Sequence, residues 1–305
     1  MIIFSLPLYK YFATGLAKKG GFKIGKCEFL RFPNREIYIK ILENVRGKKC
    51  LVIGSSMPPE ENLFYTLSLI HTLKKEGAKE VKVLIPYLAY SRHEQNESGK
   101  SWETKWLGEV LQISGAKKLT TFDLHTFKDE NVFSIPIISL GTVPIVTELI
   151  KRIKSTNLTL IAADMGALSL VKRINKNLKI KLPIAHFHKT RTSQGVILES
   201  FHGRVGKEVL VIDDMLDTGE TLYKNLVKLK KWGVKKVDIF ITHGLFTPLR
   251  QDSAGQAGSI WKKLFRLGVQ NIYCTDTIPL RPEVKKNKRI KVLSILSILN
   301  KHFSH

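Results

Sequence analysis

Two carboxylates and a Thr/Gly turn follow one short apolar run, and together they have the chemistry of a sugar-phosphate site. The run Val209–Ile212 predicts a buried parallel strand, and ligands of open α/β sheets bind where such strands end. Asp213 and Asp214 come next and offer acceptors suited to sugar hydroxyls. Backbone N–H groups and two hydroxyls for a phosphate follow at Asp217, Thr218, Gly219 and Thr221. We therefore predict a ribose-phosphate site; the alternative is a turn that only caps the next helix.

The strand, loop and helix around this turn occur twice in the chain. The strand Leu51–Gly54, the helix Glu60–Lys75 and the strand Val81–Ile85 repeat the order found over Leu210–Ile241. Two similar units of this kind predict two α/β domains, each with a mainly parallel sheet flanked by helices. The first copy has Gly54–Pro59 in place of the acidic loop, so we expect only the second copy to bind ribose phosphate.

The two domains are expected to meet near Gly141–Val146. We predict an N-terminal domain over residues 1–142 and a C-terminal domain over residues 143–305. The second domain is predicted to close with a helix over Val292–Phe303, behind the basic segment Lys285–Lys291, which we interpret as a solvated connection.

The composition is strongly basic. In 305 residues, 50 Lys and Arg against 26 Asp and Glu give a formal net charge of +24. Such a charge suits nucleic acid, but the lysines are spread along the chain and no recognition-helix or zinc-finger pattern accompanies them. We therefore expect small polyphosphate substrates, which a positive field also attracts, and not nucleic acid.

Membrane and secreted classes find no support in the sequence. No apolar segment reaches the roughly 18 residues that a membrane span needs, and the run Ile2–Leu6 is interpreted as a first strand. Three cysteines, Cys27, Cys50 and Cys274, lie far apart, which argues against a disulfide framework or a zinc site. We expect a cytoplasmic protein with no membrane partner.

Eight patterns, of which the loop at Asp213 is one, occur in the order and spacing of one known family. They are Phe32–Glu36, Glu43–Gly47, Ile85–Tyr87 with Tyr90–Arg92, Asp123–His125, Lys189–Arg191, Asp213–Thr221, Thr242–Gly244 and Thr275–Pro279. By these motifs the chain resembles the ribose-phosphate pyrophosphokinases over nearly its whole length. The resemblance implies two phosphoribosyltransferase-like domains, of which only the second keeps the ribose-phosphate loop, and a homo-oligomer built of dimers.

The reaction that the resemblance implies moves the β,γ-diphosphoryl group of ATP to the C1 hydroxyl of ribose 5-phosphate and releases AMP. Mg²⁺ would bridge the triphosphate oxygens, and the resemblance assigns His125 and Asp164 to that metal. It assigns to Lys189 and Arg191 the stabilisation of charge on the transferring group. Because these two residues are two positions apart, an extended segment would present both on one side.

The resemblance assigns ATP binding to Phe32, Asn34, Glu36, Arg92 and His93. Phe32 could stack on adenine, and Glu36 could accept a hydrogen bond from the nucleotide. The chain departs from the family's usual residues here, with Asn34-Arg35 in place of Asp-Gly and His93 in place of Gln. In the ribose-phosphate loop, Glu220 stands where Gly is common.

Two other functions remain open on this evidence. A regulatory homologue would keep the fold and bind nucleotide without turnover, and the altered ATP-side residues are its support. A phosphoribosyltransferase would use the same loop for a different reaction. That reaction needs no triphosphate site, so the motif residues Arg92, His125, Lys189 and Arg191 argue against it. A role in nucleic-acid binding rests on charge alone.

Overall fold

The computed structural model describes residues 1–91, 101–124, 133–153, 155, 157–191, 197–248 and 259–304, and for 189–191 and 197–199 it describes the backbone alone. The chain forms two compact units, Met1–Leu140 with Leu296–His305, and Gly141–Ile295. The predicted division after residue 142 therefore lies two residues beyond the start of the second unit. The predicted second domain also includes the final helix, and this is wrong. Helix α9 (Leu296–Phe303) packs against α1 (Lys10–Gly20) of the first unit.

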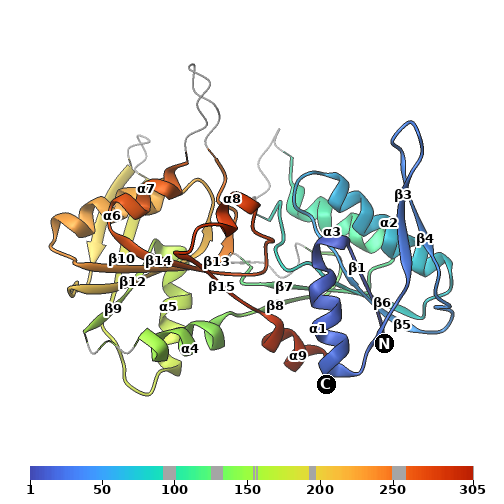
Figure 1. Cartoon of the computed structure of the whole chain (residues 1–305), viewed down its shortest axis with the longest axis horizontal. Coiled ribbons are helices and arrows are strands. Elements are labelled where there is room, and N and C mark those ends of the chain that lie inside the picture. Colours follow the sequence, from blue (N-terminus) through green and yellow to red (C-terminus); the bar gives the residue numbers. More distant parts are fainter. Residues whose placement is uncertain are drawn as a thin grey trace. The chain divides into compact units, whose positions relative to one another are not determined.

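The first unit contains a parallel sheet of six strands. In sheet order they are β2 (Lys23–Ile24), β1 (Ile2–Ser5), β5 (Lys49–Ile53), β6 (Glu80–Leu84), β7 (Lys118–Phe122) and β8 (Ile137–Leu140). Helices α2 (Glu61–Lys75) and α3 (Glu103–Ile113) cover one face, and α1 and α9 cover the other (Figure 1). A short 3-10 turn, η1 (Pro7–Tyr9), leads into α1. This arrangement buries strand side chains on both faces of the sheet.

An antiparallel hairpin of β3 (Cys27–Arg31) and β4 (Ile37–Ile41) is added to this unit. The hairpin packs against α2 and pairs with no other strand in the described part of the chain. Along β4, half-buried residues alternate with exposed ones, as expected for a two-stranded ribbon with one face toward the protein and the other toward solvent. The turn between the two strands, Phe32–Glu36, lies at an exposed tip.

The second unit contains a sheet of seven strands, all parallel except for the pair β10 and β11. In sheet order they are β11 (Ile197–His202), β10 (Ile184–Arg191), β9 (Leu158–Ala162), β12 (Glu208–Leu216), β13 (Lys236–Gly244), β14 (Val269–Thr275) and β15 (Ile290–Leu293). The two α/β sheets confirm the predicted fold class.

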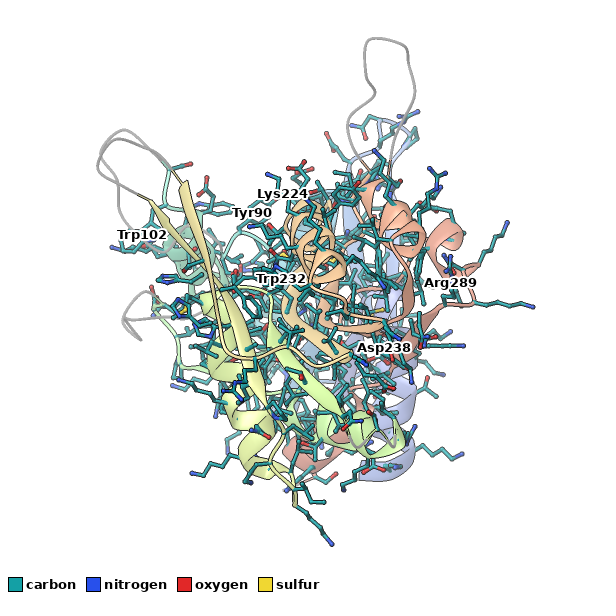
Figure 2. All side chains as sticks on the ribbon, turned by 90° about the vertical axis from the view of Figure 1, so that its left-hand side faces the viewer. Tyr90, Trp102, Lys224, Trp232, Asp238 and Arg289 are labelled. Carbon is teal, nitrogen blue, oxygen red and sulfur yellow. The ribbon has the colours of Figure 1, made fainter. Side chains whose placement is uncertain are left out.

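Helices lie on both faces of the second sheet. The pair α4 (Val143–Ile153) and α5 (Met165–Asn177) covers one face, and α6 (Glu220–Lys231) and α7 (Ile260–Arg266) cover the other (Figure 1). Figure 2 shows Lys224 and Trp232 at the α6 side of this unit. Val211 packs toward the α6 and α7 side, whereas Leu210 packs toward α4 and α5. Burial on both faces is why the run before Asp213 is continuously apolar.

The predicted internal repeat is confirmed down to its hydrogen bonds. In both copies a parallel pair of strands, β5 with β6 and β12 with β13, is joined by one helix. Each helix is followed by a glycine with positive φ, 86° at Gly77 and 81° at Gly233. The N–H groups of Ala78 and Val234 then donate to Leu73 and to Leu229 five residues back. This helix ending requires a left-handed residue, which explains glycine at the same place in both copies.

The end of the chain differs from the prediction. The closing helix begins at Leu296, not at Val292, because Val292 lies in β15, which pairs with the edge strand β14. Two short elements also occupy the ends of the predicted solvated connection, α8 (Pro282–Lys285) and the start of β15. The pairing with β14 satisfies the backbone of a segment in which Ile290 is buried and the next two residues are exposed. None of the described helices is long and apolar enough to cross a membrane.

Candidate functional site

The predicted ribose-phosphate loop lies at the carboxyl end of β12, the central strand of the second sheet, between β9 and β13. It enters α6 through Gly219, whose φ of 91° is strained for other residues. Within the described residues, the N–H groups of Thr218 and Gly219 have no hydrogen-bond partner. The first helical residue, Glu220, has an exposed side chain. Unpaired donors at the N-terminus of a 12-residue helix form an anion site.

Three carboxylates gather where β9 and β12 end. Asp213 is 7% exposed, and its Oδ1 accepts a hydrogen bond of 3.0 Å from the N–H of Asp214. Burial, followed by the negative charges of Asp214 and Asp164, raises the pKa of the Asp213 carboxyl well above its usual range. Asp164 itself caps α5, accepting from the N–H of Ala167 at 2.9 Å. A ligand that brings positive charge or hydroxyl donors to these carboxylates would relieve their repulsion.

Asn225 of α6 is a site residue that sequence reasoning missed. Its side chain is 1% exposed, and Nδ2 donates to the carbonyl of Ala163 at 2.9 Å. Asn225 thereby connects the helix that follows the ribose-phosphate loop to the segment that carries Asp164. The available signal was a polar residue among the buried apolar positions Leu222, Leu226 and Leu229 of the helix.

The predicted ATP-side residues of the hairpin lie together at its tip in the first unit. Phe32 is 51% exposed and stacks on Tyr38, with ring centroids 4.5 Å apart and planes at 30°. The N–H of Glu36 donates to Oδ1 of Asn34 at 3.1 Å, and Arg35 has a φ of 71°. The Asn34 side chain therefore shapes the turn, and Arg35 occupies a left-handed position that favours glycine. Phe32 and Glu36 are exposed and accessible to a ligand.

Other predicted residues fall partly or wholly outside the described part of the chain. Arg92, His93 and His125 lie outside the described residues, as do the side chains of Lys189 and Arg191. The backbone of β10 is extended through both of the latter positions. It pairs antiparallel with β11, with Lys189 opposite position 199 and Arg191 opposite position 197.

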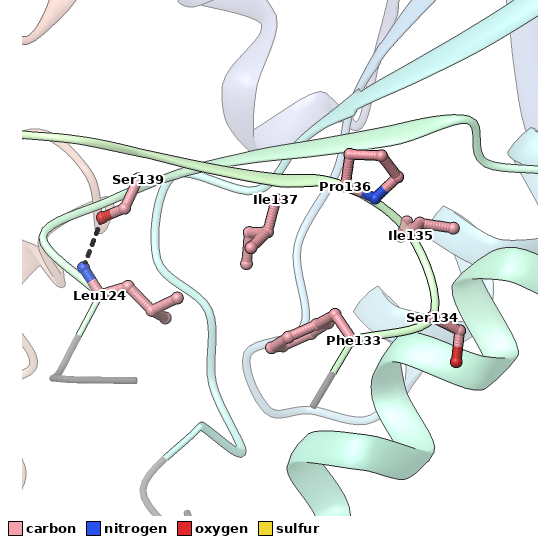
Figure 3. A pocket seen from close by; sticks show the side chains of 7 residues that line it. All are labelled: Leu124, Phe133, Ser134, Ile135, Pro136, Ile137 and Ser139. Carbon is pink, nitrogen blue, oxygen red and sulfur yellow. Dashed lines mark hydrogen bonds between the residues drawn. The ribbon is translucent and has the colours of Figure 1, made fainter. Parts of the chain in front are cut away.

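A pocket of about 620 Å³ lies at the carboxyl end of β7 and beside β8 in the first unit (Figure 3). It is lined by Leu124, Phe133, Ser134, Ile135, Pro136, Ile137 and Ser139. The N–H of Leu124 donates to Oγ of Ser139 at 2.9 Å across one side of it. Among the residues that the structure describes, the lining carries no charged side chain.

No group of three or more His, Cys, Asp or Glu side chains converges as a metal-ligand set among the residues that the structure describes. The three cysteines are free thiols, with Cys50 and Cys274 buried. Burial raises the pKa of the Cys274 thiol to about 12, which makes it an inert packing residue.

Known protein families match both halves of the chain. A family described as the N-terminal domain of ribose phosphate pyrophosphokinase matches residues 1–115. A phosphoribosyl transferase domain family matches residues 139–256, which include the whole loop from Asp213 to Thr221.

Individual relatives match over nearly the whole chain. A ribose-phosphate pyrophosphokinase of Fusobacterium nucleatum is 29% identical over 290 residues, covering 94% of this chain and 88% of the relative. One of Corynebacterium efficiens is also 29% identical, covering 100% of this chain and 92% of the relative. The crystal structure of phosphoribosylpyrophosphate synthetase from Mycobacterium smegmatis superposes with a TM-score of 0.84 at 26% identity, covering 99% of this chain and 96% of that one.

Proposed function

Because the chain belongs to the ribose-phosphate pyrophosphokinase family, we propose that it transfers the β,γ-diphosphoryl group of ATP to ribose 5-phosphate. The C1 hydroxyl oxygen forms a bond to the β-phosphorus, and the bond from that phosphorus to the α,β-bridging oxygen breaks. AMP leaves, the hydroxyl proton is lost, and 5-phosphoribosyl 1-diphosphate forms. The observation that carries this proposal is the ribose-phosphate loop, in which unpaired N–H groups lie next to two carboxylates.

The loop suits both ends of ribose 5-phosphate. The unpaired N–H groups of Thr218 and Gly219, with the helix N-terminus behind them, would hold the 5-phosphate. The hydroxyls of Thr218 and Thr221 would add donors, and the Asp217 segment completes the turn. Asp213 and Asp214 would accept hydrogen bonds from the ribose hydroxyls. Each carboxylate would then have a donor next to it, which would offset the repulsion between the two negative charges.

Mg²⁺ is the metal that the proposed reaction requires. Asp164 offers carboxylate oxygens, the kind of ligand that Mg²⁺ prefers, and its negative charge is one of the causes that raise the pKa of Asp213. We assign the ion to Asp164 and His125, with water and substrate oxygens as its other ligands. When bound, it would neutralise charge on the triphosphate.

Lys189 and Arg191 would stabilise charge on the diphosphoryl group as it moves. Both belong to the extended strand β10, where residues two apart share a side. On the ATP side, we assign Phe32 to stacking on adenine, because its exposed ring lies on Tyr38 at the hairpin tip. Glu36 and Asn34, with Arg92 and His93, would complete the nucleotide contacts.

The proposal extends to assembly and location. In the family's arrangement the hairpin contributes to a neighbouring subunit's site, so we propose a homo-oligomer built of dimers. Nucleic acid is no part of the proposed function, and the net charge of +24 would instead attract anionic substrates. The free thiols fit a reducing cytoplasm, where ATP and ribose 5-phosphate would be available.

Phosphorus NMR of the purified chain with ATP, ribose 5-phosphate and Mg²⁺ tests this function. We expect AMP and a diphosphate ester of ribose to appear in equal amounts. Lys189→Ala should lower the rate at least 100-fold, whereas Lys179→Ala, at an exposed position after α5, should not change it. ATP hydrolysis without a ribose product, or no reaction at all, would contradict the proposal.

One observation favours a second candidate, a regulatory homologue that binds nucleotide without turnover. Arg35 adopts a φ of 71° at the hairpin tip, which strains the turn that carries the ATP-side residues. Such a protein would bind ATP in calorimetry yet give no AMP in the NMR assay. Restoring glycine with Arg35→Gly would then increase ATP affinity without producing turnover.

A further inference from the structure

Two motifs of the sequence have no part in the function proposed so far, Thr242–Gly244 and Thr275–Pro279. The structure brings them side by side, because Thr242 and His243 end β13 and Thr275 ends the neighbouring strand β14. Four polar residues of these motifs are buried: Thr242, Thr275 and Thr277 are 0% exposed, and His243 is 3% exposed. Polar groups buried this deeply are costly unless they are hydrogen-bonded to one another.

These residues form one hydrogen-bonded network, which we call the Thr/His network: Thr242, His243, Thr275 and Thr277. Thr275 Oγ1 and Thr277 Oγ1 lie 2.7 and 3.1 Å from the carbonyl oxygen of Thr242. The two hydroxyls are 2.9 Å apart, and Nδ1 of His243 lies 2.9 Å from Thr277 Oγ1. Thr275 and Thr277 thus both bond to the end of β13, and Thr277 also lies within hydrogen-bond distance of His243.

The segment that leaves β13 is bonded directly to the ribose-phosphate loop. The N–H groups of Leu245 and Phe246 donate to the carbonyl of Leu216 at 2.9 and 3.0 Å. The N–H of Thr247 donates to the carbonyl of Asp217 at 3.1 Å. These three bonds fix the backbone where β12 turns into the phosphate loop. We call this segment, Leu245–Thr247, the strap.

The strap is itself held rigidly. Phe246 is fully buried with a φ of 51°, and its ring meets Trp261 edge to face at 5.5 Å. Its carbonyl accepts a hydrogen bond from Arg281. A Cβ added to Gly219 would lie 3.5 Å from the backbone nitrogen of Trp261, so the same tryptophan also contacts the far end of the loop. A left-handed non-glycine residue persists only where its surroundings fix it.

We propose that His243, Thr275 and Thr277 are positioning residues for ribose 5-phosphate. These residues fix the end of β13. The strap follows that end and bonds to Leu216 and Asp217, so the position of the loop backbone depends on the network. The N–H groups of the loop are thereby held in place for the 5-phosphate. This inference rests on the proposed function, since it deepens the account of the same loop. It assigns to the network an effect on ribose 5-phosphate and none on ATP.

The matched variants Thr277→Val and Thr277→Ser test this role in the full chain. Valine keeps the shape and removes the hydroxyl, whereas serine keeps the hydroxyl. Calorimetry with Mg²⁺ would give the dissociation constants of ribose 5-phosphate and ATP separately. We expect Thr277→Val to weaken ribose 5-phosphate about tenfold, or about 1.4 kcal/mol, with ATP affinity within twofold of wild type. Thr277→Ser should bind both ligands as wild type does.

A second pair keeps the test decisive if the valine variant does not fold. Thr247→Pro removes the N–H that donates to Asp217 together with the threonine side chain, whereas Thr247→Ala removes the side chain and keeps the N–H. The proline variant should lose ribose 5-phosphate affinity, and the alanine variant should not. Unchanged ribose 5-phosphate affinity in the valine or the proline variant, or equal loss of both ligands, would overturn the positioning role alone. A wild type that binds no ribose 5-phosphate would overturn the proposed function together with this inference.

Discussion

Replacement of Asp213 by asparagine should stabilise the ligand-free protein while it weakens substrate binding. Asp213 is buried, and burial together with the charges of Asp214 and Asp164 raises the pKa of its carboxyl. The charged form is therefore disfavoured in the folded state. Asparagine has nearly the same shape, and its Oδ1 can still accept the 3.0 Å hydrogen bond from the N–H of Asp214. The substitution removes the repulsion and keeps the local geometry.

The size of the effect follows from the charges. Two carboxylates about 6 Å apart repel by about 3 kcal/mol at an effective dielectric constant of about 20. Asp214 and Asp164 are only half-buried, so solvent screens them, and we take about 2 kcal/mol as the gain. For a unit of this size, such a gain raises the melting temperature by about 4–8 °C.

The pH dependence has a definite sign. The folded-state pKa of Asp213 lies above the ordinary 3.8, so the folded protein binds this proton more readily than the unfolded chain does. As the pH falls through the raised pKa, Asp213 becomes protonated in the folded wild type, and the destabilisation caused by its buried charge is removed. The advantage of Asp213→Asn should be largest at a pH above the raised pKa and should disappear as the pH falls toward the usual carboxyl range.

Thermal unfolding of the ligand-free chain without Mg²⁺, at pH 7.5 and below, measures this. The matched control is Asp238→Asn, since Asp238 is equally buried but accepts two hydrogen bonds of 3.0 Å from Asn271 (Figure 2 shows Asp238). That carboxylate is paired with donors, so its replacement should not stabilise the protein. A melting temperature of Asp213→Asn at or below wild type at pH 7.5 would refute the reasoning.

Three further predictions concern the same unit. Gly219→Ala forces a side chain at φ 91°, and should destabilise the protein by about 1–2 kcal/mol and weaken ribose 5-phosphate binding, as urea unfolding and calorimetry would show. Asn225→Leu leaves the carbonyl of Ala163 without its donor, and should cost about 1–2 kcal/mol in urea unfolding; no loss would mean that water replaces the amide. The pKa of His186 is lowered by burial and by the nearby His202, so stability should fall as the pH drops below about 6.5. His186→Gln should reduce the difference in melting temperature between pH 7.5 and pH 5.5, and an unchanged difference would contradict this.

The fold was predictable from the sequence where local pattern and tertiary role agree. The predicted strands Leu51–Gly54 and Val81–Ile85 lie within two residues of β5 and β6, because each is a short apolar run bounded by polar or turn residues. The elements at the edges were not predictable in this way. Val292 is exposed, and it is a strand residue only because β14 offers an open edge for pairing. Whether a short basic segment extends a sheet depends on its partner strand.

The candidate site also contains some residues that could be singled out from the sequence and others that could not. Gly219 and the Asp213-Asp214 pair were singled out by residue type, since a left-handed turn favours glycine and carboxylates accept hydrogen bonds from sugar hydroxyls, and their role in binding stays a prediction. The supporting residues were not. Thr277 and His243 lie 34 positions apart, and their hydrogen bond exists only because β13 and β14 are neighbours. A sequence shows which residues can bind a ligand, but contacts between strands determine what holds them.

The two copies of the repeat differ in how their loops use backbone hydrogen-bond donors. In the first unit the corresponding loop uses its polar groups on itself: the N–H of Ser55 donates to Thr66 Oγ1 at 2.9 Å, and the N–H of Met57 donates to Ser55 Oγ at 3.1 Å. The Ser56 hydroxyl accepts from the N–H of Ala89 at 2.9 Å. In the second unit Thr218 and Gly219 keep their N–H groups unpaired within the described residues, and the strap bonds only to carbonyls of the loop. The same strand-helix-strand frame thus carries one loop whose donors bond to neighbouring residues and one whose Thr218 and Gly219 N–H groups stay available in the described part of the chain, where a neighbouring segment supports the loop through its carbonyls.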